Sequence, residues 1–177
     1  CCQLYHPLEN EYFDRLVRYV RERNGAYCIP MQESLRKILE FKKAKRPVIV
    51  GYISDQTPFW WNIHHWLTFL HHDTPVLTGA ERIVKHTDQV FVYGDMKRVK
   101  RGHYNCEFKV LREDTKRAKP FEITDEYFRR MEQSIRQQPE IYLWSHNRWK
   151  RTRAIFDEHF EYADGKVRLQ TGKDMIW

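Results

Sequence analysis

The feature that most limits how this chain can fold is a short apolar run that ends in four polar residues. Residues 48–53 are β-branched at four positions and follow Pro47. Such a run is typical of a strand covered on both faces, as in a mainly parallel sheet. Ligands of open α/β sheets bind beyond the carboxyl ends of the strands. Asp55 and Gln56 are therefore candidate site residues, and the alternative is an Asx-type turn that only satisfies backbone N–H groups.

Helical periodicity on the N-terminal side of this run predicts two amphipathic helices, at residues 10–24 and 31–45. A short strand over residues 27–29 separates them. The alternation of helix and strand predicts the α/β class, with a mixed, mainly parallel sheet flanked by helices. The first helix has Asn10 as its N-cap and a predicted inward face formed by Phe13, Leu16, Val17 and Val20.

The C-terminal side is less regular. Residues 58–75 predict a long aromatic loop, and loops of that length are usually functional. A capping box of Thr78 and Glu81 predicts the start of a helix that ends near residue 88. A strand at residues 89–93 follows, and Thr124 is the expected N-cap of a last long helix.

An antiparallel edge hairpin is expected between those helices. Residues 103–112 alternate between apolar and polar side chains, as in a strand with one face in the core. A basic turn at residues 97–102 joins this strand to the preceding one. The predicted core face consists of Tyr104, Cys106, Phe108 and Val110.

With 177 residues, a single domain over residues 1–177 is expected, with a core at 4–153 and a polar tail at 154–177. Its content of apolar and aromatic residues argues against disorder. No run approaches the about 18 to 20 apolar residues of a membrane span, and no signal peptide is evident. Because the chain opens with Cys-Cys-Gln, we expect it to be the C-terminal part of a longer protein. Four cysteines without paired spacing favour a reduced, cytoplasmic setting.

The positive charge is concentrated in one stretch. Residues 97–119 hold nine Lys and Arg against three Asp and Glu, a net +6 of the total +7. Such a field attracts phosphates, anionic lipid headgroups or an acidic protein. The alternative is a solvated hairpin whose lysines prevent edge-to-edge aggregation.

Two histidine patterns suggest other chemistry. His64, His65, His71, His72 and Asp73 invite a metal hypothesis, but their spacing matches no compact ligand motif, and we expect no metal and no cofactor. The roles of these four histidines stay open. A further pattern, His6-x4-Glu11, has the spacing of a general base and its orienting carboxylate, but it lies in the lead-in to a helix.

The order of the motifs is more informative than any one of them. The chain contains Tyr5-His-Pro-Leu-Glu-Asn10, then Arg-x-Arg-Asn-Gly25, a strand that ends at Asp55-Gln56, and Thr74-Pro-Val-Leu-Thr-Gly79-Ala-Glu. It continues to Pro139-Glu-x-Tyr-Leu-Trp144-x-His146-x-Arg148-Trp149-Lys150. Over residues 4–153 this succession resembles the lipid A biosynthesis (lauroyl/myristoyl) acyltransferase family, and most closely its Bacteroidetes lysophospholipid-acyltransferase-like members. The resemblance implies part of a glycerolipid-acyltransferase-like α/β fold.

The resemblance also implies an activity. Members transfer a fatty acyl chain from an acyl carrier protein or CoA thioester to a hydroxyl of a lipid A precursor or related lipid. They work at the cytoplasmic face of the inner membrane behind an N-terminal anchor. Their His-x4-Asp/Glu signature precedes the segment that matches Tyr5-His-Pro7, so we expect no catalytic residue among residues 1–177 and no activity of this chain alone. His6 and Glu11 do not inherit that role.

Residues that would bind substrates follow from this implied activity. Asp55 and Gln56 would orient the acceptor or the missing dyad, and the basic turn would hold a lipid phosphate or an acidic carrier protein. Trp144, His146, Arg148 and Trp149 are expected to form a packing cluster. The family's Phe-Phe-Gly signature after Asp-Gln is absent, so the resemblance gives no acyl length or acceptor. The predicted substrate-binding set is Asp55, Gln56, Phe59, Trp60, Trp61, Trp66, Arg98, Lys100 and Arg101, with Leu67 and Phe69 as further groove lining.

A second function class is a basic module that binds nucleic acid or another polyanion. It would need aromatic side chains interleaved with Lys and Arg along one groove. Here the aromatic stretch at 58–69 and the basic stretch at 97–119 are separate, and no nucleic-acid motif is present. The acyltransferase reading is therefore preferred, and no nucleic-acid partner is expected.

Overall fold

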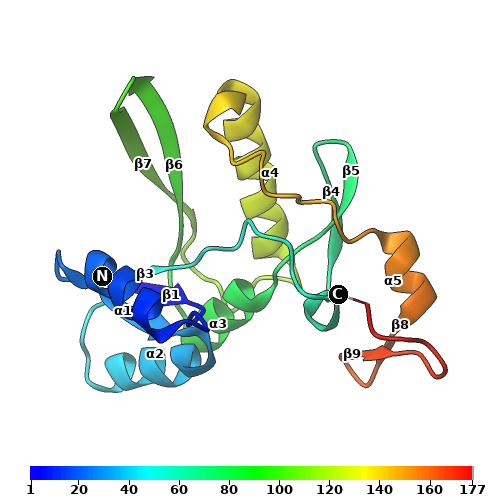
Figure 1. Cartoon of the computed structure of the whole chain (residues 1–177). Helices are drawn as coiled ribbons and strands as arrows, with labels where there is room; N and C mark the ends of the chain where they lie inside the picture. Colours follow the sequence, from blue (N-terminus) through cyan, green and yellow to red (C-terminus); the bar gives the residue numbers. More distant parts are fainter. Residues whose placement is uncertain (177) are drawn as a thin grey trace. The chain divides into compact units, whose positions relative to one another are not determined.

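The computed structural model describes residues 1–176 and has a mixed α/β fold, as predicted (Figure 1). The chain forms two compact units, residues 1–53 and 54–177. The first contains a three-stranded parallel sheet, and the second contains three antiparallel hairpins. The single domain over residues 1–177 stays a prediction.

The first unit is a parallel sheet with the strand order β2-β1-β3. Asn10 caps α1 as predicted, because its Oδ1 accepts hydrogen bonds from the backbone N–H groups of Tyr12 and Phe13, both at 3.1 Å. Gly25 lies beyond the helix with φ +82°, a conformation that favours glycine. The elements are β1 (Cys2–Tyr5), α1 (Glu11–Glu22), β2 (Tyr27–Pro30), the 3₁₀ turn η1 (Met31–Glu33), α2 (Ser34–Lys43) and β3 (Val50–Gly51).

Two predictions for this unit are wrong. The run at 48–53 is not a strand covered on both faces: β3 is two residues long, it pairs with β1 alone among the described strands, and Ile49 is 75 % exposed. The central position belongs to β1, which the sequence analysis missed. The apolar face of α1 is also exposed, at Phe13 for example. Apolar periodicity identifies such a face but not the surface that covers it.

The second unit begins with the aromatic stretch, which is not one long loop. Trp60–Asn62 form the 3₁₀ turn η2, and β4 (Trp66–Phe69) pairs antiparallel with β5 (His72–Pro75). Leu70 and His71 form the turn with φ of +50° and +67°. Two-residue hairpin turns with positive φ usually contain Asn or Gly. Leu-His lacks that signal, so the sequence contains no local indication of this hairpin.

Two apolar clusters form the core of the second unit. One contains Trp60, Ile63 and Trp66 and is closed by side chains from the C-terminal segment. The other packs β4, β6 and α4 together through Phe69, Tyr93 and Phe128. The remaining elements are α3 (Gly79–Thr87), β6 (Phe91–Lys100), β7 (His103–Arg112), α4 (Glu122–Gln137), the 3₁₀ turn η3 (Pro139–Ile141), α5 (Arg153–His159), β8 (Phe160–Ala163) and β9 (Lys166–Leu169).

The segment that the sequence analysis describes as a polar tail contributes to this core. It contains α5 and the β8–β9 hairpin, shown in orange and red in Figure 1. Phe156, Phe160 and Val167 are buried against the cluster of Trp60 and Trp66. The hydrophilic composition of residues 154–177 conceals these three positions, because they are spaced along different elements.

β6 and β7 form a two-stranded ribbon rather than the edge of the parallel sheet (Figure 1). The predicted core face of β7 is wrong: Tyr104, Phe108 and Val110 are exposed and Cys106 is half-buried. The ribbon packs on α4 through its opposite face instead, where Tyr93 and Asp95 of β6 are buried. Alternation marks two faces but does not decide which one meets the core when both contain aromatic residues.

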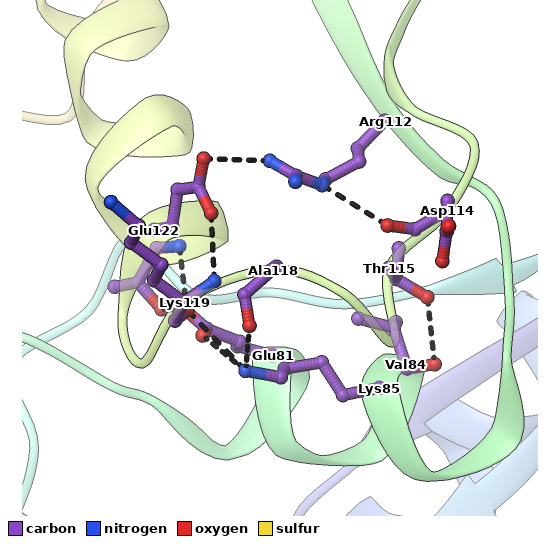
Figure 2. A network of polar contacts seen from close by, with 10 residues as sticks. Glu81, Val84, Lys85, Arg112, Asp114, Thr115, Ala118, Lys119 and Glu122 are labelled. Carbon is purple, nitrogen blue, oxygen red and sulfur yellow. Dashed lines mark hydrogen bonds and ion pairs between the residues drawn. The ribbon is translucent and has the colours of Figure 1, made fainter.

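A polar network joins α3 to the start of α4 and replaces both predicted caps (Figure 2). Thr78 makes no capping hydrogen bond. Glu81 instead accepts hydrogen bonds from the backbone N–H of Thr124 at 2.9 Å and from its hydroxyl at 2.7 Å. Thr124 is therefore inside α4, which begins at Glu122 after Phe121 with φ +65°. Lys85 bonds the carbonyl of Ala118, which holds the intervening loop.

Candidate functional site

The backbone around Asp55 is clamped by the motif at residues 146–149. The Thr57 hydroxyl donates a hydrogen bond to the carbonyl of Arg148 at 2.6 Å, and the Thr57 N–H approaches His146 Nε2 at 3.4 Å. The guanidinium of Arg148 donates from Nη1 to the carbonyl of Asp55. Residues about ninety positions apart thus fix the position of Asp55. Sequence reasoning expected only packing from Arg148.

Arg148 is buried to an unusual degree for an arginine, with 1 % of its surface exposed. Its guanidinium carbon lies 5.6 Å from the centre of the Phe69 ring and 5.0 Å from that of Phe128. Burial lowers the pKa of Arg148, although a guanidinium remains charged in proteins. In the described part of the chain, its Nε and Nη2 groups have no hydrogen-bond partner. The site therefore holds a buried cation with unused donors.

Tyr127, Tyr142 and Asp55 lie near enough to that cation to influence its pKa, and Tyr93 lies near Asp55. Burial raises the pKa of Tyr93, Tyr127 and Tyr142, and the negative charge of Asp55 raises it further in each case. These phenols therefore stay protonated at neutral pH and retain an O–H donor. The Tyr93 hydroxyl already donates to Ser134 at 3.0 Å. The half-buried carboxylate of Asp55 lies near enough to all three to influence their ionisation.

This arrangement is suited to holding a polar ligand group. A carboxylate accepts hydrogen bonds from a hydroxyl, and a nearby buried guanidinium favours an anionic or polarised oxygen. None of these side chains is an activated nucleophile such as a serine or cysteine beside a base. The arrangement can therefore hold a hydroxyl group or an anionic oxygen, and it supplies no nucleophile of its own.

The aromatic residues of the predicted substrate set occupy two environments. Trp60 is 3 % exposed and stacks on Phe160 with ring centres 5.4 Å apart, and Trp66 packs against Phe156. Their core packing differs from the predicted groove lining, as does the full burial of Phe69. Contact of these residues with an acyl chain stays a prediction.

Phe59, Trp61 and Gln56 are the members of that set that lie at the surface beside Asp55 in sequence. Phe59 and Trp61 stack on each other with ring centres 5.7 Å apart and planes 5° apart. About half of each side chain is exposed. Arg151 also lies over the Phe59 ring, with its guanidinium carbon 5.2 Å from the ring centre. This exposed aromatic pair is the part of the predicted lining that is open to a ligand.

The predicted basic residues lie at the end of the β6–β7 ribbon. Arg98 forms an ion pair with Glu140 at 3.0 Å, and its backbone exchanges two hydrogen bonds with the Gln138 side chain. Lys100 and Arg101 are exposed at the turn. Within residues 1–176, no described contact links these cations to Asp55. The structure therefore separates the two halves of the predicted substrate set.

The histidines of the aromatic stretch make structural contacts. His65 bonds Asp125 at 2.7 Å, His71 Nε2 lies 3.1 Å from Arg136 Nη2, and the ring centre of His72 is 4.6 Å from that of Trp149. Burial and the charge of Arg82 lower the pKa of His64. Within residues 1–176, no three His, Cys, Asp or Glu side chains come together in an arrangement that would hold a metal ion.

Trp144 departs from the expected packing cluster. It is half exposed, and its indole N–H donates to the carbonyl of Pro139 at 2.6 Å. Trp149 meets the expectation better, since it packs against the second core cluster and donates from Nε1 to the Thr74 hydroxyl at 2.9 Å. Arg148 and Trp149 therefore both lie against the second core cluster, whereas the recorded side-chain contact of His146 is with Thr57.

One cavity of about 190 Å³ lies at the base of the ribbon. Two ion pairs lie in the lining of this cavity: Arg112 with Glu122 at 2.8 Å, and Arg129 with Glu126. None of the predicted substrate-binding residues lines it. The lining residues are Phe91, Leu111, Arg112, Glu122, Ile123, Glu126 and Arg129.

Comparison with protein families places the chain beside a known one. The family model described as bacterial lipid A biosynthesis acyltransferase matches residues 2–151, which include Asp55 and the clamp at 146–149. No curated protein matches the chain. Among residues 1–176, no helix combines the length and apolar character that crossing a bilayer requires.

Proposed function

The chain belongs to the bacterial lipid A biosynthesis acyltransferase family, and from this premise we propose that it is part of an enzyme that acylates a lipid hydroxyl. The acyl donor is a thioester of acyl carrier protein or of coenzyme A. The acceptor is a lipid A precursor or a related lipid. The finer assignment to Bacteroidetes lysophospholipid-acyltransferase-like members rests on the motif order alone.

The reaction converts a thioester into an oxygen ester. The acceptor oxygen attacks the thioester carbonyl carbon, a C–O bond forms, the C–S bond breaks, and the proton of the hydroxyl ends on the thiol that leaves. A general base that takes the hydroxyl proton accelerates this step. The family's His-x4-Asp/Glu signature supplies such a base, and we place it N-terminal to Tyr5 in the full-length protein.

Within this chain, Asp55 and Gln56 position the acceptor. The observation that carries this role is the clamp: Arg148 bonds the carbonyl of Asp55, and Thr57 bonds His146 and the carbonyl of Arg148. The Asp55 carboxylate stays half-buried near three protonated phenols. Positioning of a reacting hydroxyl lowers the entropic cost of the bimolecular step. The exposed stack of Phe59 and Trp61 contacts the apolar part of a substrate.

The cations at the ribbon turn recognise negative charge. Lys100, Arg101 and Arg98 bind a lipid phosphate or an acidic carrier protein. The place of action that fits these partners is the cytoplasmic face of the inner membrane. An anchor upstream of this chain would hold the enzyme there.

An acyl-transfer assay of the protein expressed from the full-length reading frame tests this proposal. The purified protein is incubated with acyl carrier protein or CoA thioesters and with lipid A precursors, and the products are identified by mass spectrometry. We expect one added acyl chain with the full-length protein, and none with residues 1–177 alone. Acylation by residues 1–177 alone would contradict the upstream position of the base. No acylated lipid with any donor and acceptor pair would contradict the function.

A further inference from the structure

The β6–β7 ribbon has one polar face and one apolar face. Paired residues of an antiparallel ribbon project to the same side, and the register pairs Val92 with Val110 and Met96 with Cys106. Phe108 pairs with Gly94, and a Cβ on Gly94 would lie 3.6 Å from the Phe108 ring. The ring therefore covers the glycine, and the apolar face is continuous along both strands.

This apolar face is open to solvent over most of the ribbon. Phe108 is 75 % exposed, and Tyr104, Val110, Met96 and Val92 are exposed as well. The opposite face is occupied: Asp95 accepts hydrogen bonds from Lys109 at 2.9 Å and from Ser134 of α4 at 2.7 Å. Packing on α4 thus fixes the ribbon by the face that contains Tyr93 and Asp95, and leaves the apolar face of Phe108 outward.

The exposed face ends in cations, and neither strand contributes a carboxylate to it; the carboxylate of Glu140, from η3, is already paired with Arg98. Tyr104 pairs with Arg98, Lys100 ends β6, and Arg101 lies in the turn beyond it. Glu107 and Asp95, the acidic residues of the two strands, alternate to the other face. Exposed aromatic and aliphatic side chains beside cations match the interface of a bilayer with anionic headgroups, where apolar area and charge attraction add.

We propose that the ribbon lies on an anionic lipid bilayer, with the face formed by Val92, Met96, Tyr104, Phe108 and Val110 against the acyl boundary and with Lys100 and Arg101 on the headgroup phosphates. This inference rests on the proposed function, since it names the surface by which the enzyme meets its lipid substrate. A second copy of the chain fits this face less well, because the strands offer no carboxylate on this face to the cations of another turn, and Glu140 is already paired with Arg98.

Vesicle co-sedimentation of residues 1–177 tests the proposal without any turnover. The vesicles contain phosphatidylcholine alone or an equal mixture with phosphatidylglycerol. The test variant is Tyr104→Asp/Phe108→Asp. Its matched control, Asn105→Asp/Gln133→Asp, adds the same two charges to exposed positions of β7 and α4 that lie outside the proposed face. Circular dichroism establishes that both variants retain the fold.

We expect binding to the mixed vesicles and at least about tenfold weaker binding by the test variant, because two large apolar side chains no longer enter the interface. The control variant loses much less affinity for the mixed vesicles than the test variant does. Lys100→Gln/Arg101→Gln lowers affinity for the mixed vesicles about 30-fold and removes the preference for phosphatidylglycerol.

Three results would overturn the proposal. These are equal binding by the test and control variants, no vesicle binding at all, or a dimer in light scattering that the test variant alone dissociates. Because the assay needs no donor or acceptor, its failure is distinct from failure of the proposed acyl transfer. Vesicle binding without acylation by the full-length protein would contradict the proposed function alone.

Discussion

Arg148 shows how a single side chain can be held for position rather than for stability. Its guanidinium is buried, and two of its nitrogen groups have no hydrogen-bond partner within the described residues. Each unpaired buried donor costs about 1–3 kcal/mol. The contacts with the rings of Phe69 and Phe128 return about 2 kcal/mol when desolvated. Arg148 therefore contributes little net stability. Its hydrogen bond to the Asp55 carbonyl instead fixes the position of Asp55.

The first prediction follows from this balance. Arg148→Met keeps much of the side-chain volume and removes the buried charge, so the free energy of unfolding in urea stays within about 1 kcal/mol of the unsubstituted chain or rises. In the full-length protein the same substitution lowers acyl transfer at least about tenfold, because Asp55 loses an anchor. Arg148→Lys does not rescue activity, since an ammonium cannot reproduce the planar contacts. Full activity of Arg148→Met would show that the clamp is dispensable.

The second prediction concerns Asp95 and pH. Burial raises the pKa of this 5 % exposed carboxyl, but hydrogen bonds from Lys109 and Ser134 outweigh burial, and the pKa lies below its ordinary value. A carboxyl with a depressed folded pKa stabilises the fold above its unfolded pKa, about 3.9. That stability is lost as pH falls through the folded value.

Urea unfolding at pH 7 and at pH 3 measures this effect. Asp95→Asn destabilises the chain by about 1–3 kcal/mol at pH 7, since Lys109 and Ser134 lose a charged acceptor. At pH 3 the free energies of unfolding of Asp95→Asn and of the unsubstituted chain differ by less than at pH 7. A constant difference between the two pH values would contradict the assigned ionisation.

The candidate site could be predicted from sequence only in part. Four polar residues after an apolar run identified Asp55 and Gln56, and the ordered motifs identified the string that contains Arg148. Their contact could not be predicted, because ninety intervening residues carry no local signal for which backbone carbonyl a buried guanidinium will meet. The one local indication is that Arg148 lies between two tryptophans, which favours burial of its side chain.

At the scale of elements, the start of α4 depends on a neighbour instead of its own cap. Glu81 of α3 is buried and bonds both the N–H and the hydroxyl of Thr124. A carboxylate at a helix N-terminus also complements the helix dipole. In the same network, Glu122 is exposed and bonds Arg112 and the Lys119 N–H (Figure 2).

The third prediction compares these two carboxylates. Glu81→Gln lowers the free energy of unfolding by about 1–3 kcal/mol, because a buried charged acceptor is lost. Glu122→Gln is the matched control and changes stability much less, since exposed ion pairs are weak. Urea denaturation followed by circular dichroism measures both. Equal effects would mean that burial of Glu81 does not matter to the α3–α4 junction.

The fourth prediction concerns α5 and the C-terminal hairpin. Phe156→Ala removes a ring that packs against Trp66 and Phe160, and should cost about 3–5 kcal/mol. Ile155→Ala, at a partly exposed position of the same helix, costs much less. Thermal unfolding and tryptophan fluorescence report the change. If Phe156→Ala leaves both signals unchanged, residues 154–176 are not part of the core.

The elements differ in how far sequence could predict them. The helix capped by Asn10 was recovered because its cap and periodicity agree. The prediction of a strand covered on both faces at 48–53 is wrong, because a β-branched run indicates a buried strand but not the position of that strand in the sheet. The β4–β5 turn and the core residues Phe156 and Phe160 lacked a local signal, since each depends on packing between distant segments.

At the scale of the whole molecule, the mixed α/β class and the family were predictable because motif order survives errors in individual elements. The family match over residues 2–151 confirms the resemblance. Acyl transfer is thereby supported in general terms, and the donor, the acceptor and the surface that meets the membrane are the parts that we propose.

The most direct test of the central claim, that a clamped Asp55 positions the acceptor hydroxyl, is acyl transfer by the full-length protein carrying Asp55→Asn. We expect product formation to fall about 100-fold or more at saturating donor, with an unchanged circular dichroism spectrum, because an amide cannot accept hydrogen bonds as a carboxylate does. Asp157→Asn, at an exposed carboxylate of α5, should leave the rate unchanged. Transfer by Asp55→Asn at the rate of the unsubstituted enzyme would contradict the account.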